Sequence, residues 1–132
     1  ALILFNEAGV PCVFWGDLLG SPDSDDLPAV RELPILMSIR ARAAVGPQHN
    51  AFDNPDVVGF AREGKSEIPG SGCAVILSDR MAAEKTLYVG HRHAGQEWEC
   101  ILGGHPSVRV ADDGTLAGVV SDGGLSVYVP RA

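Results

Sequence analysis

The sequence predicts a mostly β protein, an antiparallel Greek-key β-sandwich preceded by the tail of a larger α/β domain. After Gly46, short runs rich in Val, Ile, Tyr and Phe recur between Gly, Asp and Pro residues, which is typical of an all-β fold. Residues 1–46 instead combine helical segments with one continuous apolar run, which is typical of a buried parallel strand. A segment of that size cannot close a sheet alone. We therefore expect two parts, residues 1–46 and residues 47–132.

The first part is predicted as helix, strand, loop and helix. Residues 1–7 suit the end of a buried helix that Gly9 terminates. Residues 10–15 lie between two glycines and predict a strand buried on both faces. The segment 18–26 is rich in Gly, Ser, Pro and Asp and predicts a loop. A helix is expected over about 27–45, where acidic residues precede it and basic residues lie near its end. Its expected apolar face consists of Val30, Leu33, Leu36 and Met37.

The second part is predicted to hold seven strands joined by tight turns. The strands are expected near 57–62, 73–78, 86–90, 97–101, 107–111, 115–120 and 125–129. Two turn signals are strong, Asp112-Asp113-Gly114 and Asp122-Gly123-Gly124. Short strands at regular spacing with such turns indicate an antiparallel sandwich or Greek key.

Composition excludes several classes of protein. Of the 132 residues, 45% are hydrophobic and 20% are charged, which is typical of globular proteins and argues against wholesale disorder. No apolar run approaches the roughly 18 residues that a membrane span needs. The net charge of −7 argues against a nucleic-acid surface, because such surfaces neutralise phosphates with Lys and Arg. We expect a monomer with neither a nucleic-acid nor a membrane partner.

The cysteines favour a reducing compartment. Cys12, Cys73 and Cys100 are odd in number, and none lies in a C-x-x-C motif. Each stands in an apolar stretch, so we expect buried thiols that act as small hydrophobes. Three unpaired cysteines indicate the cytoplasm. The sequence opens at Ala1 inside an apolar segment with no signal-peptide features, so we expect the true N-terminus upstream.

Several blocks, taken in order, resemble one enzyme family. Residues 9–17 read G-V-P-C-V-F-W-G-D and resemble the G-x-P-x-x-F-Y-G-D block on the eighth barrel strand of α-amylases. Residues 47–64 read P-Q-H-N-A-F-D-N-P-D-V-V-G-F-A-R-E-G and resemble the family's Q-H-D-Y-F-D-H-P-D-V-I-G-W-T-R-E-G stretch. Further matches follow at 70–79, 88–90, 93–95 and 123–131. By these blocks the chain is identified as a member of glycoside hydrolase family thirteen, in the liquefying bacterial and intracellular fungal α-amylase group.

The resemblance implies a role within a larger enzyme. Residues 1–46 would be the last strand and helix of a catalytic (β/α)8 barrel, and residues 47–132 the all-β C-terminal domain. The full enzyme would hydrolyse internal α-1,4-glucosidic bonds of starch or glycogen with retention, and the barrel would bind the α-glucan. The family's catalytic carboxylates precede residue 1 in the family order, so no catalytic residue is expected here and the chain alone should be inactive. Phe60 and Leu116 replace family tryptophans, so we expect looser packing than the family norm.

Four residues are candidates for ligand contacts. Asp17 follows the expected barrel strand, on the face where barrel enzymes bind substrate, although it could instead cap its own turn. In part of the family a calcium ion bridges the barrel and the C-terminal domain. Its ligands match the carboxylates of Asp56 and Asp79 and the backbone carbonyl of Pro55, all hard oxygen donors suited to calcium. The alternative is that Asp56 and Asp79 are ordinary turn residues.

Two other interpretations carry less weight. His91 and His93 could bind zinc if they shared a strand face, but no third ligand has a suitable spacing, so we expect solvated histidines in a turn. A free-standing, non-catalytic β-sandwich that binds carbohydrate or a protein partner is the alternative to an amylase fragment. Such a module would present exposed aromatic residues, whereas Tyr88, Trp98 and Tyr128 fall at expected core positions.

Overall fold

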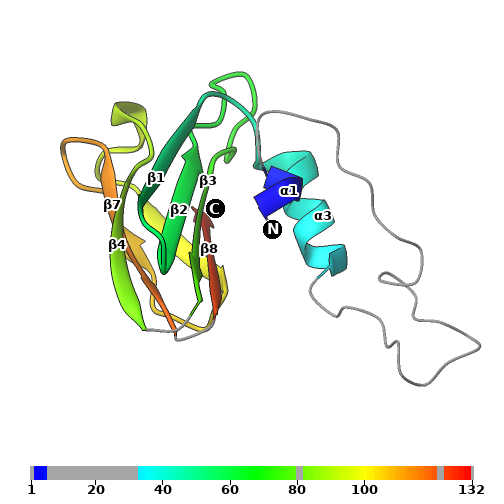
Figure 1. Cartoon of the computed structure of the whole chain (residues 1–132). Helices are drawn as coiled ribbons and strands as arrows, with labels where there is room; N and C mark the ends of the chain where they lie inside the picture. The colour runs from blue at the N-terminus through cyan, green and yellow to red at the C-terminus, as the bar shows by residue number, and fades with distance from the viewer. Residues whose placement is uncertain (1, 6–32, 80–81, 122–123, 132) are drawn as a thin grey trace, which may run out of the picture.

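The computed structural model describes residues 2–5, 33–79, 82–121 and 124–131 (Figure 1). The helices are α1 (Leu2–Phe5), α3 (Leu33–Arg42) and the short 3-10 helix η1 (His91–His93). The strands are β1 (Gln48–Asn54), β2 (Val57–Arg62), β3 (Cys73–Ser78), β4 (Ala83–Tyr88), β5 (Glu97–Leu102), β6 (Val108–Arg109), β7 (Thr115–Val120) and β8 (Leu125–Pro130). The strand predicted over 10–15, the loop over 18–26 and the start of the helix over 27–45 lie outside the described residues.

The strands form an antiparallel sandwich, as predicted. One sheet has six strands in the order β1-β2-β3-β8-β5-β6, and the other pairs β4 with β7. The final strand, β8, lies between β3 and β5, so strands distant in sequence pair as Greek-key folds require. In the part of the chain that is described, no helix is long and apolar enough to cross a membrane.

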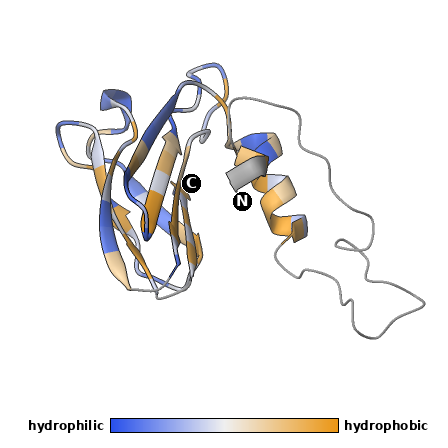
Figure 2. Ribbon diagram, viewed as in Figure 1, coloured by the Kyte–Doolittle hydropathy of each residue, from blue (hydrophilic) through white to orange (hydrophobic). Residues whose placement is uncertain are grey.

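Apolar strands were predicted more accurately than polar ones. The predicted bounds of β2, β3 and β7 agree with the structure, whereas β4 begins three residues earlier than predicted, at Ala83 instead of 86. Strand β1 was missed, because its sequence Q-H-N-A-F-D-N shows no apolar alternation and is mostly hydrophilic (Figure 2). It forms nevertheless, because its backbone pairs with β2 at the edge of the sheet.

The central strands of the larger sheet are buried on both faces. The side chains of β2, β3 and β8 alternate between two apolar clusters. One cluster faces β4 and β7 and the other faces the helices, which lie on opposite sides of these strands (Figure 1). The cluster between the sheets includes Trp98, Leu116 and Tyr128, and the helix-side cluster includes Phe5, Ile39 and Phe60. Phe60 and Leu116 are both fully buried, and the looser packing expected of them remains a prediction.

The apolar face of helix α3 agrees with the prediction at Leu33 and Leu36, which pack in the helix-side cluster, and differs from it at Met37. Leu36, Ile39 and Ala43 are buried against the sheet, while Met37 is 37% exposed. The spacing of three and four residues places these three side chains on one side of the helix. The prediction is therefore confirmed for Leu33 and Leu36 and wrong for Met37, while Val30 lies outside the described residues.

Candidate functional site

The structure brings two of the predicted calcium ligands together. Asp56 lies in the turn between β1 and β2, and Asp79 directly follows β3. Val57 of β2 pairs with Ser78 of β3, so the residues next to them, Asp56 and Asp79, stand opposite each other. The backbone N–H of Asp79 donates a 2.9 Å hydrogen bond to the carbonyl of Asp56. Both aspartates and the preceding Pro55 are exposed at this end of the sheet.

These residues fit part of a calcium shell. Two carboxylates and the Pro55 carbonyl are hard oxygen donors, but calcium takes six to eight oxygens. The carbonyl of Asp56 already accepts the amide of Asp79. Across the described ranges, no group of three or more His, Cys, Asp or Glu side chains is close enough to hold a metal. A complete shell around Asp56 and Asp79 would therefore require oxygens from elsewhere.

Asp17, the residue predicted to lie near substrate, is outside the described part of the chain. Cys12 is outside it as well. Cys73 and Cys100 are free thiols, and burial raises the pKa of Cys73 to about 12. Cys100 is half-buried and donates from Sγ to the carbonyl of Leu102 at 2.9 Å. The prediction of a buried thiol is confirmed for Cys73.

The histidines at 91 and 93 lie in the turn η1, not on a strand. His91 is exposed, and its Nδ1 lies 2.7 Å from the hydroxyl of Tyr88. His93 is only 3% exposed, so the prediction that it is solvated is wrong. Its Nε2 donates to the carbonyl of Glu63 at 2.6 Å, and its Nδ1 lies 2.7 Å from Oε1 of Gln96. Its ring stands edge-on to Trp98, with 5.0 Å between the ring centroids. Both ring nitrogens already have polar partners within the protein, which argues against a zinc-ligand role for His93.

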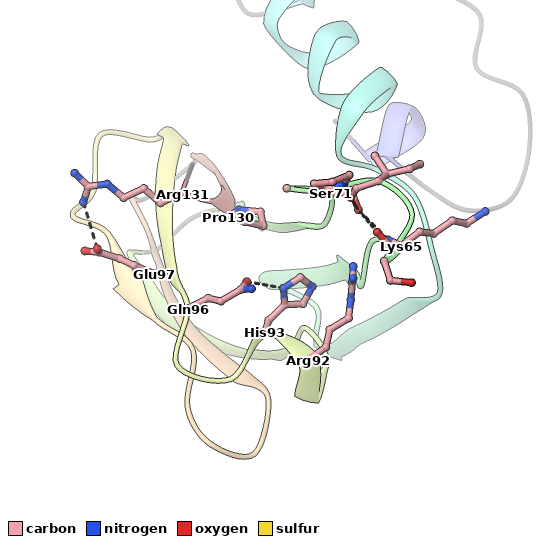
Figure 3. Close-up of a pocket in the computed structure, with 12 residues that line it drawn as sticks. Lys65, Ser71, Arg92, His93, Gln96, Glu97, Pro130 and Arg131 are labelled. Atoms are coloured by element: carbon pink, nitrogen blue, oxygen red, sulfur yellow. Dashed lines mark hydrogen bonds and ion pairs between the residues drawn. The ribbon is translucent and has the colours of Figure 1, made fainter.

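A hollow of about 730 Å³ lies between the loop 65–71 and the segment 92–97 (Figure 3). Its polar groups are largely paired within the protein: Ser71 Oγ donates to the carbonyl of Ile68, and Glu97 pairs with Arg131 at 3.4 Å. Lys65 and Arg131 point outward from opposite rims (Figure 3). Glu97 is the single carboxylate among its lining residues, so the hollow lacks the pair that retaining glycosidases use.

A second hollow, of about 560 Å³, opens between β1 and β4. Phe52 is half-exposed there, and Nζ of Lys85 contacts Oδ1 of Asp53 at 2.6 Å. The hydrogen bond from Lys85 holds the pKa of Asp53 below its ordinary value. Lys85 is largely buried while Asp53 is exposed, so the pair neutralises a cation that the strand places inside the protein.

The comparisons with known proteins agree on one family. No protein-family model matches the chain. It is 38% identical to the α-amylase of Geobacillus stearothermophilus over 99% of its own length and 24% of that protein. It is 37% identical to the α-amylase of Bacillus licheniformis and 36% to the cytoplasmic α-amylase of Escherichia coli, over 26% and 28% of those proteins. This chain is homologous to the C-terminal part of α-amylases. It spans about a quarter of the length of these curated relatives.

Solved amylase structures share this fold. The α-amylase of Anoxybacillus superposes with a TM-score of 0.65 over 97% of this chain and 30% of that one, at 19% identity. A structure of AmyP in complex with maltose superposes with a TM-score of 0.53 at 14% identity. At such identities the likeness shows the fold alone. Together with the curated relatives, it agrees with the predicted resemblance to the C-terminal part of α-amylases and with the predicted β-rich fold.

Sequence reasoning missed a set of contacts around residues 62–64. Arg62 ends β2 and Glu63 directly follows it, and the two residues bond to segments from both parts of the chain. One signal was present: Arg62 stands in an otherwise apolar strand, V-V-G-F-A-R, whose residues are nearly all buried. A charged residue in such a strand is buried only when polar partners satisfy it.

Proposed function

We propose that this chain forms the C-terminal region of an α-amylase that hydrolyses internal α-1,4-glucosidic bonds of starch or glycogen with retention. The observation that carries the proposal is the 38% identity over 99% of the chain to an α-amylase. The packing of a helical segment on one face of a β-sandwich supports it, because a sheet that is apolar on both faces needs cover on both.

In this proposal residues 1–46 belong to the barrel and residues 47–132 form the supporting β domain. The boundary is supported by Gly46, whose φ of 83° turns the chain between α3 and β1. The role of the β domain is to cover the barrel's last helix, whose Leu36 and Ile39 would otherwise face water. The catalytic carboxylates and the α-glucan site would lie in the barrel, and Asp17 is proposed to contact substrate there.

Calcium is proposed as a bridge between the two domains. Asp56, Asp79 and the Pro55 carbonyl would hold it from the β-domain side, where it would link the two domains electrostatically. The adjacency of Asp56 and Asp79 supports this assignment. A cytoplasmic location and a monomeric state are proposed as well, and one relative is named a cytoplasmic α-amylase.

A chimera tests the proposal. The corresponding C-terminal quarter of the Geobacillus stearothermophilus α-amylase is replaced by this chain, and release of reducing ends from soluble starch is measured. The chimera is expected to exceed, by at least tenfold, the same enzyme truncated before that quarter. The chain alone is expected to release no reducing ends above a blank. A folded chimera that is no more active than the truncated enzyme contradicts the proposed role.

The alternative, a free-standing carbohydrate-binding module, has less support. Trp98 and Tyr128 are fully buried, and Tyr88 is half-buried between His49 and His91. Among the described residues, Phe52 is the single exposed aromatic side chain. A sugar-binding face of the usual kind would need more aromatic surface than that.

A further inference from the structure

The guanidinium of Arg62 connects the β-sandwich to the helical segment. Arg62 is only 7% exposed. Its Nη1 donates to the carbonyl of Phe5 in α1 at 2.8 Å, and its Nε donates to the carbonyl of Gly46 at 2.8 Å. A buried guanidinium is tolerated only when its donors are satisfied, and a hydrogen bond from a charged donor is stronger than one between neutral groups. One side chain of β2 therefore bonds both the first helix and the connection from α3 to β1.

Glu63 and Gly64, which follow Arg62, bond the end of β2 to other segments. Glu63 bonds to residues 92–93 and to β1, and Gly64 bonds to the connection between α3 and β1. The carbonyl of Glu63 accepts hydrogen bonds from Arg92 Nη2 at 2.7 Å and from His93 Nε2 at 2.6 Å. Its carboxylate meets Nε2 of His49 at 2.7 Å. The N–H of Gly64 donates to the carbonyl of Val45 at 2.8 Å. Residues 62–64 thus contact residues 1–46 through Arg62 and Gly64 and contact the sandwich through Glu63.

We propose that Arg62 is an interdomain latch, which holds the helical segment against the outer face of the β-sandwich. The planar fork of its guanidinium places two donors in fixed directions, so it can bond two carbonyls from different segments at once. The apolar cluster between helices and sheet supplies non-directional attraction, and the latch specifies where the helices sit. This inference concerns the packing of the two parts and does not depend on amylase activity.

The latch predicts local opening when it is removed. Local opening differs from global unfolding because amides of one unit exchange faster while the rest of the protein stays protected. The amides of α3 report on the helical segment, and those of β4 and β7 report on the far side of the sandwich, which Arg62 does not contact. Hydrogen exchange of the 132-residue chain, followed by mass spectrometry, measures both units in one sample.

Arg62→Met is expected to speed exchange in α3 at least tenfold and in β4 and β7 less than twofold. Arg62→Lys is expected to speed exchange in α3 at least fivefold, because one ammonium cannot reproduce the fork. The matched control is Arg109→Met, which removes an exposed arginine whose Nη1 donates to Gly95 at 3.3 Å. It is expected to change both units less than twofold.

The proposal is overturned if α3 is unchanged, or if α3 and the β4–β7 pair speed up by the same factor. The second result would mean that Arg62 stabilises the whole fold. If circular dichroism shows that Arg62→Met does not fold, the test uses Arg62→Lys instead. The proposal is then overturned if exchange in α3 is unchanged in that variant, or if exchange in α3 and in β4 and β7 speeds up by the same factor.

Discussion

The backbone amide of Asp79 bonds the carbonyl of Asp56 at 2.9 Å, which holds two exposed aspartates from separate turns side by side. Neighbouring carboxylates repel each other, and a cation between them relieves that repulsion. This backbone contact is the observation behind the calcium ion proposed at Asp56 and Asp79.

Calcium is expected to bind the isolated chain weakly and to stabilise the chimera with the Geobacillus barrel. Two carboxylates and one carbonyl leave the shell incomplete until a barrel supplies more oxygens. A ligand that binds only the folded state adds about 2.7 kcal/mol at a hundredfold excess over Kd. Thermal unfolding with calcium or with chelator measures the increment. Asp79→Ala should remove part of it.

The control for that experiment is Asp113→Ala. Asp113 is a turn aspartate whose carboxylate accepts hydrogen bonds from Thr115, which keeps its pKa below the ordinary value. Removing this carboxylate is expected to lower the melting temperature and to leave the calcium-dependent increment intact. Equal increments in the parent and in both variants would show that Asp79 is an ordinary turn residue.

Gly46→Ala is expected to destabilise the chain by more than about 3 kcal/mol, measured by urea unfolding. Gly46 has a φ of 83°, and a Cβ there would lie 2.2 Å from the carbonyl oxygen of Gly64. Gly95→Ala isolates the backbone effect, because Gly95 has a φ of 79° and a Cβ there meets nothing within 4 Å. It should cost about 1–2 kcal/mol. Similar losses in the two variants would contradict the steric argument.

Tyr128→Phe is expected to cost about 1–2 kcal/mol of unfolding free energy. The hydroxyl of Tyr128 accepts the amide of Val119 at 2.9 Å and donates to its carbonyl at 3.2 Å, which ties β8 to β7 across the two sheets. Burial raises the pKa of Tyr128, so the hydroxyl keeps its proton and can donate. Tyr88→Phe is the comparison, since it loses an exposed bond to His91 and should cost less than about 0.5 kcal/mol. If Tyr128→Phe lowers the unfolding free energy as little as Tyr88→Phe does, the hydrogen bonds between Tyr128 and Val119 do not contribute to stability.

Asp53→Asn is expected to lower stability near neutral pH and to have little effect in acid. The hydrogen bond from Lys85 depresses the pKa of Asp53, so the folded state binds this proton less readily than the unfolded chain. The stabilisation is therefore complete above the unfolded pKa of about 3.9 and is lost as the pH falls through the lower folded value. Urea midpoints of parent and variant, measured from pH 7 to pH 2.5, should converge at the acid end. A difference that stays constant over that range contradicts the ion pair as its cause.

The sequence by itself determined the parts of this protein that depend on local pattern. The apolar runs of β2, β3 and β7 predicted their own bounds, because the residues that make a buried strand are contiguous. The order of the family blocks likewise predicted the amylase relationship that the comparisons confirm. Asp56 and Asp79 could be named as partners only through that resemblance.

Only the tertiary structure decided what depends on residues far apart in the chain. Strand β1 is polar, and it is a strand because β2 supplies partners for its backbone. His93 can be buried because the carbonyl of Glu63, 30 residues away, accepts a hydrogen bond from its ring. Arg62 reaches the carbonyl of Phe5 across 57 residues. Local sequence encodes propensity and burial periodicity, whereas pairing partners are chosen by packing between distant segments, which no local pattern contains.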